Sequence, residues 1–198
     1  MIRTGIYGGS FNPVHNGHIA IAEAMLRLGG LDEVWLMVSP QNPLKQTSGL
    51  LDDRLRLEMV RRAVEDIPNV MACDYEFCLP RPSYMWRTLQ ALSHDCPDRE
   101  FTLLIGADNW AVFDCWYHAA DIVATYPVCI YPRRGCDIDA AALPPTVRLV
   151  DTGLYDVSST LVRERVRRGE DVAQLVPESI LGMVKEYYGP NNKTAPKV

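Results

Sequence analysis

Short runs of apolar and β-branched residues recur along the chain, and stretches with the apolar spacing of helices lie between them. The runs predict six strands, at 2–7, 33–38, 70–74, 101–105, 127–131 and 147–149. Strands that alternate with helices form βαβ units, which assemble a parallel sheet through right-handed crossovers. We therefore expect the α/β class: a Rossmann-like parallel sheet flanked by helices, in a single domain.

Apolar stripes predict three helices, at 19–26, 55–67 and 83–93. Gly29 and Gly30 follow the first stripe and provide a C-terminal stop. Asp52 and Asp53 precede the second stripe, where a carboxylate can cap the first backbone N–H groups, and Pro68 follows it. The segment 41–49 is polar and contains proline, so we expect a flexible loop there.

The composition is that of a soluble globular protein, because 47% of the 198 residues are hydrophobic and 23% are charged. This length fits one domain, expected at 1–188, with a disordered tail at 189–198. The net charge of −5 argues against non-specific binding to nucleic acid or to an anionic membrane. No apolar run approaches the roughly 18 residues of a membrane span. The chain begins with a strand candidate rather than a signal peptide, so we expect a cytoplasmic protein.

The six cysteines are scattered and form no C-x-x-C pair, so we expect free thiols. Cys115 and His118 have the spacing of a metal-ligand pair. A structural zinc site needs about four ligands, and no second pair lies nearby at the usual spacing. We therefore predict no protein-bound metal site.

The most informative segment is GGSFNPVHNGH, which runs from Gly8 to His18 between the first strand and the first helix. Glycines at a strand end let the backbone approach a phosphate, and a helix start presents unpaired N–H groups to an anion. His15 and His18 are three residues apart, so they share one helix face and can donate to phosphate oxygens. An isolated H-x-x-H pair is usually unremarkable, but here it coincides with a strand end, glycines and a helix start. The segment lacks the Walker A and G-x-G-x-x-G patterns.

A second candidate anion site is the run of hydroxyl residues at Ser158, Ser159 and Thr160, followed by Arg163. Hydroxyls before an apolar pair predict a helix start, and Arg163 lies one turn inside that helix. Hydroxyls, unpaired N–H groups and a guanidinium fork together suit a polyphosphate. The alternative is an ordinary capped helix with a basic face.

A third candidate lies at the end of the strand at 101–105, where Gly106 precedes Asp108. The glycine permits close approach of a ligand, and the carboxylate can accept hydrogen bonds from ribose hydroxyls. The alternative is a plain turn in which Asp108 caps a helix.

Together, GGSFNPVHNGH, LIGADN and SSTLVR resemble the nicotinate-nucleotide adenylyltransferases, in order and with the spacing of that family, over about 8–187. The resemblance implies a nucleotidyltransferase fold and the transfer of the adenylyl group of ATP to nicotinate mononucleotide. The products are nicotinate adenine dinucleotide and pyrophosphate, in NAD biosynthesis. The displacement is direct and in-line, so catalysis rests on positioning and charge stabilisation.

The resemblance also implies roles for individual residues. The catalytic residues are His18, which stabilises the transition state, with His15 and Arg163. The ATP site comprises Gly8, Gly9, Ser10, Phe11, Gly106, Asp108, Ser158, Ser159 and Thr160. The nicotinate mononucleotide site comprises Lys45, Ser83, Trp116 and Tyr117. Magnesium is expected as the cofactor, bound mainly through ATP oxygens.

Two alternatives remain open. One is a related adenylyltransferase that uses nicotinamide mononucleotide or another phosphate acceptor, since Met85 stands where the family usually has threonine. The other is a catalytically inactive ATP-binding module, against which the intact His15, His18 and Arg163 argue. The positive groups of Arg133 and Arg134 have no assigned role, and the oligomeric state is open, with a homo-oligomer as one option.

Overall fold

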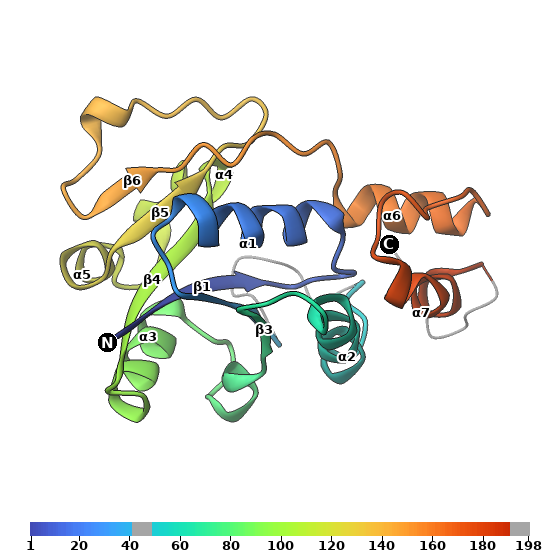
Figure 1. Cartoon of the computed structure of the whole chain (residues 1–198), viewed down its shortest axis with the longest axis horizontal. Helices are drawn as coiled ribbons and strands as arrows, with labels where there is room; N and C mark the ends of the chain where they lie inside the picture. The colour runs from blue at the N-terminus through green and yellow to red at the C-terminus, as the bar shows by residue number, and fades with distance from the viewer. Residues whose placement is uncertain (41–48, 191–198) are drawn as a thin grey trace.

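The computed structural model describes residues 1–40 and 49–190 and confirms the expected α/β class. Six strands form one parallel sheet in the order β3-β2-β1-β4-β5-β6, with helices packed around it (Figure 1). The strands are β1 (Ile2–Gly9), β2 (Glu33–Val38), β3 (Val70–Cys73), β4 (Arg99–Gly106), β5 (Val128–Tyr131) and β6 (Val147–Leu149). Most of the loop predicted at 41–49, residues 41–48, and most of the predicted tail, 191–198, lie outside the described residues.

All six predicted strands are present, and two of them, β2 and β6, have the predicted bounds. β1 and β4 both extend beyond their apolar runs into glycine. The extension follows from pairing, because Gly9 lies in register with Val38 of β2, and Gly106 lies in register with Tyr131 of β5. Apolar content alone therefore underestimates strands whose ends carry functional glycines.

The predicted helices are present as α1 (Asn16–Leu28), α2 (Asp53–Val64) and α3 (Met85–Asp95). Asp52 caps α2 as predicted, because its side chain accepts hydrogen bonds from the N–H groups of Arg54 and Leu55. α2 ends earlier than its apolar stripe, since the Ile67 N–H bonds to the Val64 carbonyl in a turn that leads into β3. The hydroxyl run starts a helix, α6 (Ser159–Arg167).

Several elements were not predicted. They are α4 (Ala107–Trp110), α5 (Ala119–Thr125), α7 (Glu178–Tyr188) and the 3₁₀ turns η1 (Tyr75–Cys78), η2 (Phe113–Cys115) and η3 (Ala140–Ala142). α6 and α7 pack together beside α2, at one end of the molecule (Figure 1). Among the residues described, no helix combines the length and the apolar character that a membrane span requires.

The sheet has a hydrophobic core on each face. Along β4, Leu104 packs into the cluster that contains α1, α2 and α7, whereas Leu103 and Ile105 pack into the cluster that contains α3 and α5. This alternation is the two-residue period of a strand that is buried on both faces. The strand order reverses between β1 and β4, and in open parallel sheets ligands bind beyond the carboxyl ends of the strands at that point.

Arg56 of α2 ties the carboxyl ends of two strands together. Its side chain is only 1% exposed. Nη1 donates to the carbonyls of Ser10 and Ser39, at 2.5 and 2.9 Å, and Nε donates to the Leu51 carbonyl at 2.9 Å. Ser10 directly follows β1 and Ser39 directly follows β2, so one guanidinium fixes where both strands end.

We expect Arg56→Met to destabilise the fold by about 2–4 kcal/mol, because several buried carbonyls lose their donors at once. The measurement is urea unfolding followed by circular dichroism. Arg61→Met on the same helix is the matched control, since Arg61 is exposed and pairs with Asp74 at the surface. Equal effects of the two substitutions would contradict the structural role of Arg56.

Candidate active site

The carboxyl edge of the sheet is hollowed by two adjoining cavities. They share the lining residues Gly8, Gly9, Ser10, Asn109 and Tyr131, so they form two parts of one cleft. One part is polar and carries arginines, and the other is lined largely by aromatic side chains. The motifs that the sequence singled out at the ends of β1 and β4 therefore meet at the strand-order reversal.

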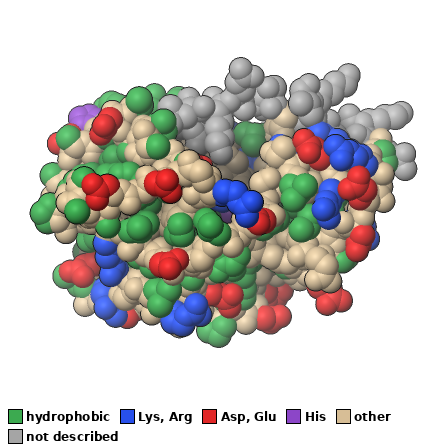
Figure 2. Space-filling view, turned by 90° about the horizontal axis from the view of Figure 1, so that it is seen from above, with side chains coloured by type: hydrophobic (Ala, Val, Ile, Leu, Met, Phe, Trp, Pro, Cys, Tyr) green, Lys and Arg blue, Asp and Glu red, His purple; other side chains and the backbone are tan. Residues whose placement is uncertain are grey.

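The polar cavity is formed by segments that are distant in sequence. The lining side chains include Ser10, Phe11, Asn12 and His18 from the β1–α1 connection, Asp108 and Arg133 from the ends of β4 and β5, and Ser159, Thr160, Arg163 and Arg167 from α6. Basic side chains gather with acidic ones over the end of the molecule formed by α6 and α7 (Figure 2). Four cationic or hydrogen-bonding groups of this cavity, His18, Arg133, Arg163 and Arg167, suit a polyanion.

His18 is oriented by the backbone of the residue that begins its own helix. The His15 N–H donates to His18 Nδ1 at 3.2 Å. Because Nδ1 accepts this bond, the neutral His18 ring carries its proton on Nε2. The ring also contacts Phe11 edge-on, with the centroids 5.0 Å apart. His18 therefore presents an N–H donor from a fixed ring.

His15 lies under His18 rather than on the cavity wall. The two rings stack with centroids 3.6 Å apart, and His15 is only 3% exposed. Burial, together with the positive charge of Arg133, lowers the pKa of His15 to about 3, so its ring is neutral at physiological pH. Its place in the structure is that of a support for the His18 ring.

Asn12 joins the β1–α1 connection to both C-terminal helices. Its carbonyl accepts a hydrogen bond from Arg163 Nη1 at 2.7 Å, and its Oδ1 accepts one from the Tyr188 hydroxyl at 2.7 Å. Ser159 Oγ donates to the neighbouring Pro13 carbonyl at 2.8 Å. These bonds place the start of α6 against the glycine segment, although the two are far apart in sequence.

The other members of the hydroxyl run have different roles. Thr160 Oγ1 accepts from Arg163 Nη2 at 3.2 Å, and both residues line the cavity. Ser158 caps α6, because its Oγ accepts from the Leu161 N–H, and it is not among the lining residues. The sequence therefore located the helix start correctly but did not separate the capping hydroxyl from those facing the cavity.

Asp108 and Arg133 form an ion pair in the wall of the polar cavity, with Arg133 Nε 3.6 Å from Asp108 Oδ1. Gly106 ends β4 and precedes α4, and a Cβ there would collide with the Asp108 carboxylate and lie 3.1 Å from Arg133 Nε. Gly106 is thus required for packing and does not itself line the cavity. Arg134 points elsewhere and pairs with Asp156 at 2.6 Å on the surface.

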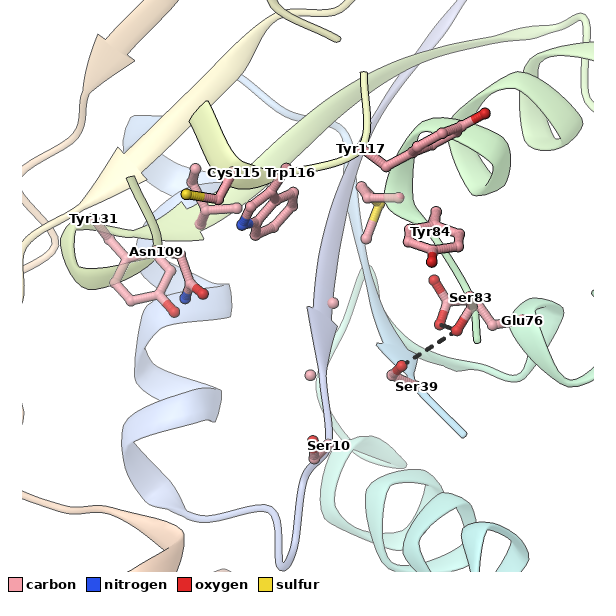
Figure 3. A pocket seen from close by; sticks show the side chains of 14 residues that line it. Ser10, Ser39, Glu76, Ser83, Tyr84, Asn109, Cys115, Trp116, Tyr117 and Tyr131 are labelled. Carbon is pink, nitrogen blue, oxygen red and sulfur yellow. Dashed lines mark hydrogen bonds between the residues drawn. The ribbon is translucent and has the colours of Figure 1, made fainter. Parts of the chain in front are cut away.

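Aromatic side chains dominate the second cavity (Figure 3). Trp116 and Tyr117 come from the segment after η2, and Tyr84 comes from the residue before α3. The Tyr84 and Tyr117 rings lie 4.9 Å apart between centroids. The Trp116 Nε1 donor is buried and has no hydrogen-bond partner among the residues that the structure describes. A planar aromatic ligand with polar substituents suits such a wall.

Small residues shape the floor of this cavity. Ser83 lines it, and the Met85 side chain covers Gly8, where a Cβ would lie 2.9 Å from Met85 Cε. Lys45, which the resemblance assigned to the same site, lies outside the described residues. Three lining residues that sequence reasoning missed, Asn109, Tyr131 and Glu76, come from the end of α4, the end of β5 and η1.

Arg133 was left unassigned, although it lies two positions beyond β5. The rule that ligands bind at the carboxyl ends of strands would have identified Arg133 as a candidate site residue. Glu76 had no comparable signal, because its neighbours in space are distant in sequence.

All six cysteines are free thiols, as expected. In the described part of the chain, no group of three or more His, Cys, Asp or Glu side chains could hold a metal ion. The Cys115 and His118 side chains serve other contacts. Cys115 lines the aromatic cavity, whereas His118 Nδ1 lies 2.5 Å from Asp121 Oδ2.

Comparison with known proteins places these features in a family context. The family model described as cytidylyltransferase-like matches residues 6–165. A Bacteroides fragilis protein named "Probable nicotinate-nucleotide adenylyltransferase" is 46% identical over 170 residues, which covers 86% of this chain and 85% of the relative. A Bacteroides thetaiotaomicron protein of the same name is 45% identical over 186 residues, which covers 94% and 92%.

A solved structure has the same fold. The nicotinic acid mononucleotide adenylyltransferase of Plasmodium falciparum, complexed with NaAD, superposes with a TM-score of 0.75 at 17% identity. The match covers 92% of this chain and 96% of that one.

The buried position of His15 predicts a pH dependence of stability. Its folded pKa lies below the unfolded value near 6.5, so the unfolded state binds the extra proton. Stability is therefore lost as the pH falls from about 6.5 towards 3, by roughly 1 kcal/mol per pH unit. Urea unfolding of wild type and His15→Gln at several pH values measures the difference. His94→Gln, an exposed histidine on α3, is the control and should follow wild type.

Proposed function

The chain belongs to the cytidylyltransferase-like family and, within it, to the nicotinate-nucleotide adenylyltransferases, and we propose that it transfers the adenylyl group of ATP to nicotinate mononucleotide. The membership confirms the resemblance found in the motifs. The observation that carries the proposal is the two-part cleft: an arginine-rich cavity and an aromatic cavity meet at Gly8, Gly9 and Ser10. This arrangement suits two nucleotides whose phosphates react at the junction.

In the proposed reaction a phosphate oxygen of nicotinate mononucleotide attacks the α-phosphorus of ATP. The bond between the α-phosphorus and the bridging oxygen breaks, pyrophosphate leaves, and nicotinate adenine dinucleotide forms. The residues supply position and charge rather than a covalent intermediate. A Cβ at Gly8 would come within 3 Å of the Met85 side chain, and one at Gly9 within 3 Å of the Phe11 side chain. Glycine at both positions therefore leaves the backbone at the junction accessible.

We assign the triphosphate to the polar cavity. His18 donates its Nε2–H to the phosphate oxygens on which charge develops, and Arg163 with Thr160 binds the β- and γ-phosphates. Ser159 already donates its hydroxyl proton to Pro13, so its contribution is its backbone N–H at the start of α6. Arg133 is a further cation for this cavity, and Asp108 accepts from the adenosine ribose.

We propose that magnesium enters with ATP. Asp108 is the one carboxylate that lines the polar cavity within the described ranges, and it is assigned to the ribose. The hydroxyls of Ser10 and Thr160 lie in the same wall and would join phosphate oxygens and water around Mg²⁺. Bound there, the ion would neutralise phosphate charge.

We assign the nicotinate ring to the aromatic cavity, against Trp116 and Tyr117. The unpartnered Trp116 Nε1 is a donor for a polar group of the ligand. Six free thiols agree with a reducing compartment, and we propose that the enzyme acts in the cytoplasm.

The first test is pyrophosphate release with ATP, magnesium and either nicotinate or nicotinamide mononucleotide. We expect clear preference for the nicotinate compound. Preference for the amide would assign the chain to the related specificity, with Met85 as the first residue to change. ATP binding in calorimetry without pyrophosphate release from either acceptor would support the inactive module.

His18→Ala removes the proposed donor to the transition state, and we expect kcat to fall by about 10²–10³-fold. His94→Ala is the matched control, because that histidine is exposed on α3. Stopped assays of pyrophosphate under saturating substrates compare the two. Turnover of His18→Ala equal to that of the control would refute the assigned role.

A further inference from the structure

A buried carboxylate stands in the wall of the aromatic cavity. Glu76 of η1 is 3% exposed and lines the cavity. Its Oε2 accepts from Ser83 Oγ at 2.8 Å, and its Oε1 accepts from Thr88 Oγ1 at 2.9 Å. Ser39, which follows β2, lies beside this pair, with its Oγ 3.5 Å from Ser83 Oγ.

The direction of these bonds follows from the number of protons. An ionised carboxylate accepts only, and each hydroxyl has one proton to give. Ser83 donates its proton to Glu76, so in the contact between the serines the donor is Ser39. Both serine oxygens that line the cavity therefore have lone pairs left and no remaining proton.

The charge and the hydrogen-bond acceptors of this wall determine which ligand groups it favours. Glu76 is the one charged side chain among the described residues that line this cavity. Phosphate and carboxylate groups carry only acceptors at neutral pH, so neither is favoured against it. A sugar hydroxyl, in contrast, is neutral and supplies the proton that Ser39 and Ser83 lack.

The position of the wall fits the middle of a nucleotide. In the view of Figure 3, Ser39, Ser83 and Glu76 lie between Ser10 on one side and Tyr84 and Tyr117 on the other. Ser10 also lines the polar cavity, whereas Tyr84 and Tyr117 belong to the aromatic wall. In a mononucleotide, the ribose likewise lies between the phosphate and the base.

We propose that Glu76 is a positioning residue for the ribose of the acceptor nucleotide: it accepts the hydroxyl proton of Ser83, and Ser83 in turn accepts that of Ser39, so both serines keep lone pairs for the ribose hydroxyls. The inference rests on the proposed function, because it takes the aromatic cavity as the acceptor site. Burial raises the pKa of Glu76 and the hydroxyl bonds oppose that shift, so the hydroxyls help to keep the carboxylate ionised.

The test is a comparison of nicotinate mononucleotide with its 2′-deoxy and 3′-deoxy analogues. For wild type, we expect kcat/KM to fall roughly threefold to tenfold for the analogue that lacks the bonded hydroxyl. In Glu76→Gln the amide N–H₂ donates to a serine oxygen, which turns that serine's proton into the cavity. We expect KM for the ribose form to rise by a similar factor, kcat to change less than about twofold, and the ribose-to-deoxy ratio to approach one.

Two further variants separate hydrogen bonding from packing. Ser83→Ala removes one hydrogen-bond acceptor from the wall and should also lower the ribose-to-deoxy ratio. This variant keeps the test valid if Glu76→Gln does not fold. Thr88→Val removes a hydroxyl that bonds Glu76 but does not line the cavity, and it should keep the wild-type ratio. An unchanged ratio in Glu76→Gln, or an equal loss in Thr88→Val, would overturn the inference.

Failure of the proposed function has a different signature. Wild type that releases no pyrophosphate with any nicotinate nucleotide would refute that function. Calorimetric titration of wild type and Glu76→Gln with the same three nucleotides then tests Glu76 alone. Equal relative affinities for ribose and deoxy forms in the two proteins would reject its role.

Discussion

The buried guanidinium of Arg56 is the interaction on which the cleft depends. Its donors go to carbonyls at the ends of β1 and β2 and before α2. A parallel sheet leaves its carboxyl-terminal carbonyls without ladder partners once the strands diverge. Arg56 donates hydrogen bonds to these carbonyls and holds the Ser10 and Ser39 backbones in place. Both residues line the aromatic cavity above, so a packing requirement of the fold also fixes the floor of the site.

The two parts of the cleft differ in electrostatics because different elements supply their charges. The polar cavity receives arginines from α6 and from the end of β5, whereas the aromatic cavity receives a carboxylate from η1. An anionic triphosphate is therefore favoured on one side and the neutral centre of a nucleotide on the other. Gly8 and Gly9 belong to both walls and have no side chain, so neither position obstructs the proposed approach of the two phosphates at the junction.

Sequence patterns predicted the sheet better than its surroundings. The strands are apolar on both faces, so their residues stand out without knowledge of the partners, and Asp52 identified the start of α2 through local capping chemistry. The helix α7 was missed even though Ile180, Val184 and Tyr188 have helical spacing, because no capping side chain identifies where it begins: Pro177 stands directly before it. The site residues in continuous motifs were found, but those defined by tertiary neighbours were not. Glu76 is an unremarkable acidic residue until Ser39, Ser83 and Thr88 surround it.

The polar cavity likewise depends on contacts between residues that are distant in sequence. The Arg163 guanidinium reaches back to the Asn12 carbonyl, and the Tyr188 hydroxyl reaches the Asn12 side chain from the end of α7. Asn12 Nδ2 also donates to the Gly49 carbonyl, so through its side chain and its backbone carbonyl Asn12 links the segment after β1 to the region before α2 and to α6 and α7. Local propensity can form the β1–α1 turn, but only these distant partners set its orientation. The geometry of His18 and Arg163 thus depends on the assembled chain, in which α7 holds the β1–α1 connection in place through the bond from Tyr188 to Asn12.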